Sequence, residues 1–408
     1  MEFTYAKTKK DLKEIADMMG RIFRRKNWFE FYEQRMSYQT KSPYFKPEHS
    51  RIARMDGKLV GHVSIIEKYM RVGICVVKVA GIGDVYTHPD ARGKHVSTHL
   101  MNDCIDYMRH NEYPISMLYG IPNFYHKFGY IEAMGEHKQF LPLKNFVKVE
   151  SDLNLRPCKK GDVPVLNTIY NENFEGKTGF MERVEKSWYN IAEPKSLFVV
   201  PDAKDKPAGY VIYVKVWGGG GYVSEVAAPT EEIKRAILAF IKEKTQEAFL
   251  SETEFRIAQK DPFAEFLKDF APRVQVKYFA EGEGNAMLRI VDLPLLLKKI
   301  KPELESRLAS SEFSRKKGGL NIKTDDAGKA CIAFQNGKIT ITKGLKKDLP
   351  TLETKQNLLT RSVMGYWTPN RLMERTKAEG FEPPKEIKPF IKALFPEGSP
   401  FTSEPDYF

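Results

Sequence analysis

The sequence predicts an α/β protein in which one α/β domain is duplicated and followed by a smaller α+β domain. Three observations support this prediction. The length of 408 residues corresponds to about three domains at roughly 150 residues each. One order of predicted strands and helices occurs twice along the chain. The last part has a different pattern of strand and helix candidates. Apolar residues make up 42% of the chain and charged residues 29%, a composition that builds packed cores and excludes a disordered protein.

A helix and a β-hairpin open the chain. Thr8 and Asp11 form a capping-box pattern, and apolar residues at helical spacing follow it. These apolar residues are Leu12, Ile15, Met19, Ile22 and Phe23. Further along, Asp56-Gly57 separates two strand-like runs and predicts a hairpin turn.

Alternating elements continue after the hairpin. Strand patterns run through residues 74–87 and are followed by a polar turn. The apolar spacing from Val96 to Met108 then predicts a helix that ends before Pro114, and residues 115–119 form the next predicted strand.

The same order of elements returns about 140 to 151 residues later. The Asp11-Leu12 motif matches Asp162-Val163, with Leu166 in place of Ile15. In the same order, KLVGHV at 58–63 matches KPAGYV at 206–211, and DVYTHP from Asp84 matches EVAAP from Glu225 with one deletion. Three matches in one order predict a duplicated α/β domain.

A third domain begins near residue 287. Strand candidates at 329–334 and 338–342 precede a helical pattern at 358–365, which is typical of an α+β domain. The expected domains are therefore 1–150, 151–285 and 286–408.

The segment Arg92-Gly93-Lys94-His95-Val96-Ser97 joins a predicted strand to a predicted helix. Unpaired N–H groups at such a helix start bind anions, and Arg92 and Lys94 add positive charge. An ordinary basic loop is the alternative. In the second repeat, Glu231 and Glu232 stand at the corresponding helix start and would repel a pyrophosphate. The sequence thus predicts one cofactor site per chain.

Lysine and arginine exceed aspartate and glutamate by 65 to 53, a net charge of +12 that favours anionic partners. The basic clusters Arg24 to Lys26 and Arg315 to Lys317 lack interleaved aromatics, so we expect solvated surface and no nucleic-acid partner. Four scattered cysteines fit neither a disulfide framework nor a zinc site. Without a predicted signal peptide or membrane span, we expect a cytoplasmic protein with no membrane partner.

The run from Gly83 to Ala133 resembles the central part of a GNAT N-acetyltransferase, ending in the segment FYHKFGY. In that family the loop follows the pattern Arg/Gln-x-x-Gly-x-Gly/Ala. This chain has Arg92, and it has His95 and Ser97 where the two small residues usually stand. With its repeat, its third domain and its tail PFTSEPDYF, the chain resembles the Eis (enhanced intracellular survival) family. The resemblance implies two tandem GNAT acyltransferase domains followed by a sterol-carrier-like domain.

The resemblance also implies acetyl-CoA as co-substrate, no metal, and a homo-oligomer such as a hexamer. The acceptor would be a primary amine of a small cationic molecule, such as an aminoglycoside, or a lysine side chain. The expected cofactor-binding residues are Val85, Tyr86, Thr87, Arg92, Gly93, Lys94, His95, Val96, Ser97, Thr98, Gly120 and Ile121.

By the same resemblance, Tyr125 is the general acid and the terminal carboxylate of Phe408 is the base. A core aromatic is the alternative for Tyr125, and His126 and Asp84 are the alternative bases. At the level of function, the alternative is a non-catalytic module that senses coenzyme A or binds a lipid.

Overall fold

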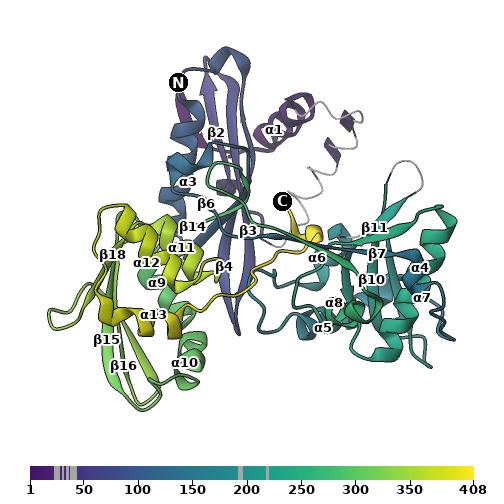
Figure 1. Cartoon of the computed structure of the whole chain (residues 1–408). Helices are drawn as coiled ribbons and strands as arrows, with labels where there is room; N and C mark the ends of the chain where they lie inside the picture. The colour runs from purple at the N-terminus through teal and green to yellow at the C-terminus, as the bar shows by residue number, and fades with distance from the viewer. Residues whose placement is uncertain (23–27, 30–31, 34–35, 37–43, 192–195, 217–219) are drawn as a thin grey trace. The chain divides into compact units, whose positions relative to one another are not determined.

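The computed structural model describes residues 1–22, 28, 29, 32, 33, 36, 44–191, 196–216 and 220–408 (Figure 1). Phe23 and the basic run from Arg24 to Lys26 lie outside these ranges. The chain divides into two compact units. The first contains Met1–Ala133, Ala280–Gly398 and Phe408, and the second contains Met134–Phe279 and Ser399–Tyr407.

A seven-stranded sheet forms the frame of the first unit. Its strands in spatial order are β1 (Glu2–Tyr5), β2 (Ser50–Met55), β3 (Lys58–Val72), β4 (Cys75–Thr87), β5 (Ile115–Gly120), β14 (Asn285–Ile290) and β6 (Ile131–Glu132). The pair β4 and β5 is parallel, and the other neighbours are antiparallel. The hairpin at Asp56-Gly57 is confirmed, with φ values of 51° and 76° that suit a type I′ turn.

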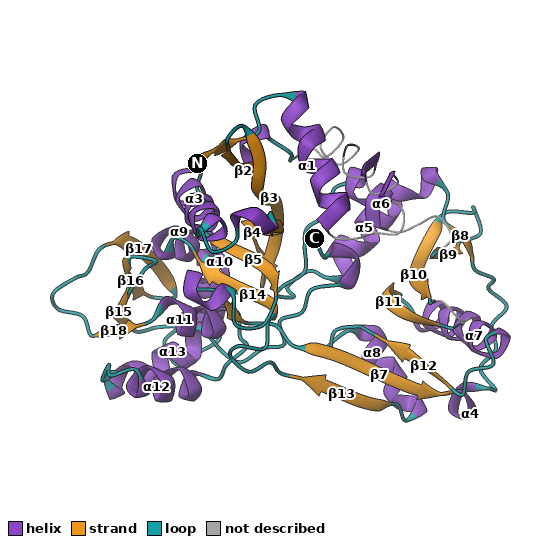
Figure 2. Cartoon of the chain, turned by 90° about the horizontal axis from the view of Figure 1, so that it is seen from above, coloured by secondary structure: helices purple, strands orange, loops and turns teal. Residues whose placement is uncertain are grey.

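Two helices cover opposite faces of this sheet (Figures 1 and 2). Helix α1 (Lys9–Ile22) begins at the predicted capping box, in which the Asp11 amide donates to the Thr8 hydroxyl over 3.1 Å and the Thr8 amide donates to Asp11 over 2.9 Å. Helix α3 (Val96–His110) buries the predicted apolar positions, namely Val96, Leu100, Met101, Cys104, Ile105 and Met108. Its spacing of apolar residues therefore predicts both its extent and its buried face.

The first unit also contains most of the third predicted domain. A four-stranded sheet has the order β17 (Lys338–Lys343), β16 (Lys329–Gln335), β15 (Lys317–Thr324) and β18 (Thr351–Thr354). Its helices are α9 (Leu293–Lys299), α10 (Lys301–Ala309), α11 (Gln356–Val363), α12 (Pro369–Ala378) and α13 (Lys388–Leu394). The strands predicted at 329–334 and 338–342 and the helix predicted at 358–365 are present. Buried Arg361 on α11 donates its Nε–H to the carbonyl oxygen of Glu132 over 2.6 Å and so joins this part to β6.

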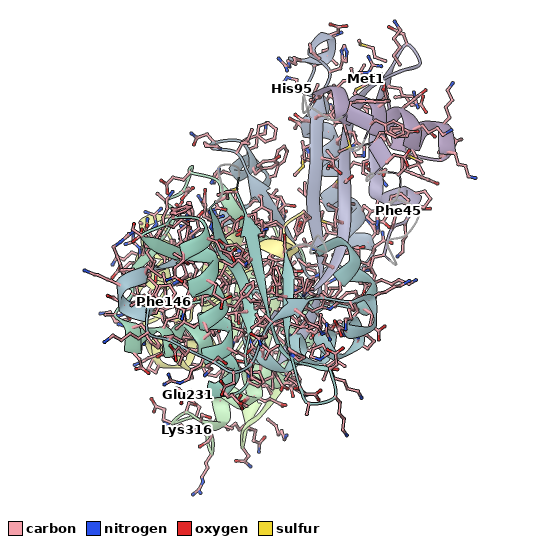
Figure 3. All side chains as sticks on the ribbon, turned by 90° about the vertical axis from the view of Figure 1, so that its right-hand side faces the viewer. Met1, Phe45, His95, Phe146, Glu231 and Lys316 are labelled. Atoms are coloured by element: carbon pink, nitrogen blue, oxygen red, sulfur yellow. The ribbon has the colours of Figure 1, made fainter. Side chains whose placement is uncertain are left out.

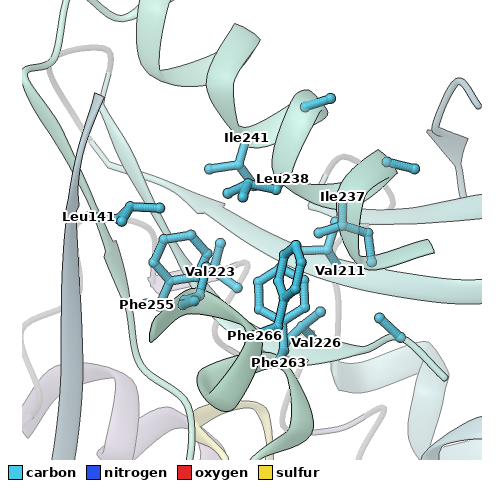
Figure 4. Close-up of a cluster of buried hydrophobic side chains, with 14 of the residues drawn as sticks. Leu141, Val211, Val223, Val226, Ile237, Leu238, Ile241, Phe255, Phe263 and Phe266 are labelled. Atoms are coloured by element: carbon cyan, nitrogen blue, oxygen red, sulfur yellow. The ribbon is translucent and has the colours of Figure 1, made fainter. Parts of the chain in front are cut away.

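The second unit repeats the sheet-and-helix plan. Its strand order is β13 (Arg273–Lys277), β7 (Glu136–Pro142), β12 (Glu252–Phe255), β11 (Gly221–Ala227), β10 (Pro207–Lys215), β9 (Leu197–Pro201) and β8 (Arg156–Pro157). Its helices are α4 (Leu143–Phe146), α5 (Val163–Asn173), α6 (Glu185–Ile191), α7 (Glu231–Glu247) and α8 (Pro262–Leu267). Figure 4 shows one core of this unit, in which Ile237 and Leu238 of α7 face Val211 and Val223 of the sheet.

The compact units do not coincide with the expected ranges 1–150, 151–285 and 286–408. Two strands pair with a sheet other than the one expected from their position in the chain. Strand β7 lies before residue 150 but pairs with β12 and β13 in the second unit. Strand β14, which follows the second repeat, pairs with β5 and β6 in the first. Backbone hydrogen bonding over long sequence separations places both strands, and local pattern does not encode such pairings.

None of the helices in the described part of the chain is both long and apolar enough to span a bilayer.

We predict that Met287→Ala lowers the free energy of unfolding by about 2–5 kcal/mol. Met287 on β14 is completely buried and belongs to the core between the sheet and α3, so truncation leaves a cavity there. Urea unfolding measures the change. Val274→Ala is the control, because Val274 is 48% exposed on edge strand β13 and its truncation should stay within about 0.5 kcal/mol. Equal effects of the two variants would contradict the placement of β14.

Candidate active site

Strands β4 and β5 separate in the middle of the first sheet. Their parallel register runs from Val79 opposite Ile115 to Ile82 opposite Leu118 and then stops. Beyond Ile82, β4 continues to Thr87, and among the described strands it pairs there only with β3. Because backbone N–H and C=O groups alternate sides along a strand, part of this stretch presents polar groups that have no ladder partner. The predicted residues Val85, Tyr86 and Thr87 all lie here.

A β-bulge lies at the same place. The register between β3 and β4 shifts between His62 and Ser64, and Asp84 has a φ of 53°. Its carboxylate accepts the Ser64 hydroxyl over 3.0 Å, and its carbonyl oxygen lies 3.1 Å from Nδ1 of His62. These contacts give Asp84, one of the alternative bases, a structural part in shaping the bulge.

Arg92 to Thr98 form the predicted loop and the first turn of α3. Gly93 has a φ of 76°, and His95 takes the left-handed conformation with φ 56° and ψ 23°. A non-glycine residue can adopt this conformation, and histidine does so more often than most. His95 therefore replaces the glycine of the GNAT pattern without preventing the turn. Arg92, Gly93, Lys94 and His95 are exposed, and Figure 3 marks His95 on the surface.

The start of helix α3 has no capping side chain: His95 is its N-cap residue and makes no capping hydrogen bond. The first N–H groups of a helix lack intrahelical acceptors, so those of Val96, Ser97 and Thr98 are available to an anion. In the second unit, a side chain caps the start of α7, because the Thr230 hydroxyl accepts a hydrogen bond from the Ile233 amide over 3.3 Å. Two glutamates also occupy the first turn of α7.

Three of the predicted cofactor residues lie beside the separated strands. The Thr87 hydroxyl is buried and has no hydrogen-bond partner among the described residues. Gly120 ends β5, where a Cβ atom would come within 2.3 Å of the Met287 sulfur and 3.1 Å of the Tyr125 ring. Ile121 follows it and is 60% exposed. The residues predicted for the cofactor thus line the separated strands and the start of α3.

Tyr125 begins a short 3-10 helix, Tyr125–Phe128. Its side chain is 8% exposed, and its ring meets Phe124 edge to face at 4.8 Å. Burial raises the pKa of Tyr125 to about 12. The hydroxyl has no hydrogen-bond partner among the described residues, whereas the hydroxyl of buried Tyr130 pairs with Ser116 at 2.7 Å.

Phe408 lies on the face of the first sheet at the point where β4 leaves β5. A Cβ atom at Gly81 would come within 2.6 Å of its ring, so only glycine leaves room for it. An equivalent atom at Gly83 would lie 3.9 Å from its carboxyl carbon. Tyr119 of β5 meets the ring edge to face at 5.6 Å, and the Lys68 ammonium lies 5.3 Å from the ring centroid. The carboxyl group is therefore held beside β4.

The other alternative base, His126, has polar partners of its own. Its Nε2 atom lies 3.1 Å from a carboxylate oxygen of Glu132, which is completely buried, and 3.1 Å from the Gly282 amide nitrogen. These contacts anchor the histidine within the first unit.

The first unit also has a cavity of about 540 Å³. It borders His126 but neither Tyr125 nor Phe408. Charged side chains dominate its wall, and Asp326 pairs there with both Arg109 and Arg289. Small-molecule sites are usually apolar with a few polar groups, so the separated strands are the better candidate for the active site.

Sequence reasoning missed Gly81, Gly83, Lys68 and Tyr119 as neighbours of Phe408. A usable signal was present in the Gly-Ile-Gly run of β4, because glycine inside a strand often marks close approach of another group. The contacts of Lys68 and Tyr119 had no such signal. Within the described ranges, no cluster of three or more His, Cys, Asp or Glu side chains could hold a metal ion.

Residues 5–133 match the family of acetyltransferase (GNAT) domains. The first repeat is thus a GNAT acetyltransferase domain, a class that uses acetyl-CoA as co-substrate, and the predicted acetyltransferase class is confirmed. A search of curated proteins found no match.

Three solved structures share the architecture over the whole chain. A conserved protein from Enterococcus faecalis, described as a probable N-acyltransferase, has a TM-score of 0.79 and 19% identity, covering 100% of this chain and 99% of its own. A GCN5-related N-acetyltransferase from Anabaena variabilis has values of 0.75 and 19%, with 100% coverage of both chains. Eis1 from Mycobacterium abscessus has 0.67 and 16%, again with 100% coverage of both. At these identities the likeness concerns the fold, and the predicted mixed α/β fold class is confirmed.

We predict that Arg92→Ala combined with Lys94→Ala weakens coenzyme A binding roughly 10- to 100-fold, because charge-assisted hydrogen bonds are lost. Calorimetry should give one site per chain, and the difference between variant and wild type should shrink as salt screens the charges. The matched control replaces Lys234 and Arg235 with Ala at the start of α7 and should leave binding unchanged. Two equivalent sites, or equal effects of both pairs, would contradict the assignment.

Proposed function

We propose that the protein transfers the acetyl group of acetyl-CoA to a primary amine, with Tyr125 as general acid and the Phe408 carboxylate as base. The observation that carries the proposal is the place of the Phe408 carboxyl group, beside Gly83 at the separation of β4 and β5. Transfer from a thioester to an amine needs an unprotonated amine, a polarised carbonyl and a proton for the departing thiolate.

In this proposal, coenzyme A binds to the first unit. The exposed N–H groups at the start of α3, with Arg92 and Lys94, would hold the pyrophosphate. Backbone groups of Val85 to Thr87 would hold the pantetheine chain and polarise the carbonyl.

Tyr125 would hold the proton that the thiolate needs. Because burial raises its pKa to about 12, the phenol remains protonated throughout the neutral range. A protonated, unpartnered hydroxyl can donate to sulfur as negative charge develops there.

The Phe408 carboxylate would accept or orient a proton of the acceptor amine. A terminal carboxyl group has a pKa of about 3.3–3.7 in water, so it is a weak base unless its surroundings are partly desolvated. The phenyl ring packed on Gly81 and Tyr119 supplies such surroundings.

The acceptor we propose is an amine of a small cationic molecule, such as an aminoglycoside, or a lysine side chain. Full-length structural similarity to Eis1 supports placing the chain near the Eis family. By that likeness we also propose a sterol-carrier-like third domain, a homo-oligomer and a cytoplasmic location. A broad amine panel with acetyl-CoA, read by release of free thiol, tests the proposal. Stoichiometric coenzyme A binding without turnover on any amine would instead favour a non-catalytic module.

We predict that Tyr125→Phe lowers kcat by about 100- to 10,000-fold with little change in coenzyme A affinity, since general acid catalysis contributes this much. In the wild type, this phenol should cause no alkaline decline in rate below about pH 11, given the pKa of about 12. Tyr130→Phe is the matched control, because it removes a buried hydroxyl and should reduce stability alone. Wild-type turnover in Tyr125→Phe would rule out Tyr125 as the general acid and leave it the role of a core aromatic residue.

We predict that appending two alanines to Phe408 abolishes most of the activity, by about 100-fold or more, because the carboxylate moves while every side chain stays. Phe408→Leu is the control that keeps the carboxylate and changes only the ring. Free-thiol release and coenzyme A binding are measured on both. An extended chain that folds, binds coenzyme A and acetylates normally would rule out the Phe408 carboxylate and make His126 or a water relay the leading base.

A further inference from the structure

The cavity of about 540 Å³ is enclosed by segments that lie far apart in the sequence but all belong to the first unit. Its wall combines one face of α3, residues 126–129, strand β14, the turn between β15 and β16, and the start of α11. Pockets for small molecules have volumes of about 300–1,000 Å³, so this cavity can hold a whole ligand. Covering its charged lining with apolar surface would cost free energy, so the ligand it fits is a charged one.

Cationic side chains outnumber carboxylates on this wall. The cations are Arg109, Lys127, Arg289 and Lys355, and the carboxylates are Asp106, Asp325 and Asp326. Two of these charges are engaged outside the wall or at its edge, because Lys355 pairs with Glu379 and Asp325 accepts the Gln356 amide over 2.8 Å. Lys127 forms no ion pair with a described residue. The start of α11 adds the positive end of a helix dipole, so the wall favours an anion.

Arg289 is the buried cation of the cavity wall. Its side chain is 1% exposed and donates to the carbonyl oxygen of Phe128 and to the Asp326 carboxylate. Its Nε atom has no hydrogen-bond partner among the described residues. Asp326 is itself 46% exposed and is shared with Arg109. A buried charge is costly unless it is fully paired, so Arg289 is short of negative charge.

The cavity is distinct from the anion site expected at the start of α3. Ser97 lies in the first turn of this helix and Arg109 in its last. The twelve residues between these positions rise about 18 Å along the helix axis. An anion held by Arg109 is therefore a different one from an anion held by the first N–H groups of α3.

We propose that this cavity binds a small polyvalent oxyanion, meaning a molecule that carries two or more carboxylate or phosphate groups. Guanidinium groups pair with both kinds of oxyanion through parallel hydrogen bonds. The Asp326 carboxylate already lies between Arg109 and Arg289, which shows that an oxyanion fits there. Lys127 and Arg109 are the more exposed cations and would meet the ligand first, with Arg289 behind them. The site does not depend on the acetyl transfer proposed above.

The test titrates citrate and pyrophosphate separately into the full-length protein by calorimetry at fixed ionic strength. We expect at least one probe to bind and to raise the Tm by mass action. Arg109→Gln combined with Lys127→Gln should weaken this binding about 10-fold or more. The matched control, Lys301→Gln with Lys316→Gln, removes the same charge from surface ion pairs outside the cavity wall and should stay within about twofold.

The probes also distinguish the source of the oxyanion. Binding of citrate alone identifies a polycarboxylate, and binding of pyrophosphate alone identifies a phosphate compound. Binding of neither probe overturns the proposal, and so does an equal loss in the cavity pair and the control pair. A site that disappears in Arg92→Ala with Lys94→Ala but survives in the cavity pair also overturns it, because the probe then binds at the start of α3.

Asp326→Asn provides a result that misfolding cannot imitate. The variant removes a carboxylate that repels the probe and leaves both arginines short of a partner. We expect a lower Tm without probe, about 10-fold tighter probe binding, and recovery of the lost Tm when the probe is added. Glu353→Gln is the matched control, because this half-exposed carboxylate pairs with Lys323 and does not border the cavity. Unchanged or weaker binding in Asp326→Asn overturns the proposal.

Discussion

The separation of two parallel strands is the constraint on which the rest of the first unit depends. Beyond Ile82 and Leu118, β4 and β5 no longer satisfy each other's backbone groups. Unpaired backbone groups need other partners. The bulge at Asp84 lies in this stretch, as does the Thr87 hydroxyl, which has no hydrogen-bond partner among the described residues. The two glycines of β4 remove the side chains that would otherwise fill the opening, and the Phe408 ring and carboxyl group lie against them.

The two repeats share one arrangement of strands and helix but differ in the residues at equivalent positions. At the start of α3 the chain leaves backbone donors uncapped and surrounds them with positive charge, whereas at the start of α7 a threonine caps the helix and two glutamates add negative charge. Where the strands separate, Asp84 accepts the Ser64 hydroxyl in the first repeat, and Glu225 pairs with buried Arg183 in the second. The two repeats thus keep one fold while their local charges differ.

Patterns that depend on near neighbours were predicted correctly. The spacing of apolar residues identified α3 and its buried face, and Asp56-Gly57 identified the hairpin, because helix and turn geometry follow from contacts within a few residues. The basic loop before α3 was equally visible, since a strand, a glycine-containing turn and a helix succeed one another in the sequence. The equivalence of Asp84 and Glu225 could also be seen from the repeat, although their different partners could not.

The sequence by itself thus determined the elements, the duplication and the basic loop that precedes α3. Only the tertiary structure decided that β14 completes the first sheet and β7 the second, that Tyr125 begins a short 3-10 helix, and that Arg183 meets Asp406. The physical reason is that strand pairing and buried ion pairs join residues far apart in the chain, Arg183 and Asp406 being 223 positions apart. Such partners are selected by the burial of whole sheet faces and by the cost of an unpaired charge, and neither leaves a periodic pattern in the sequence.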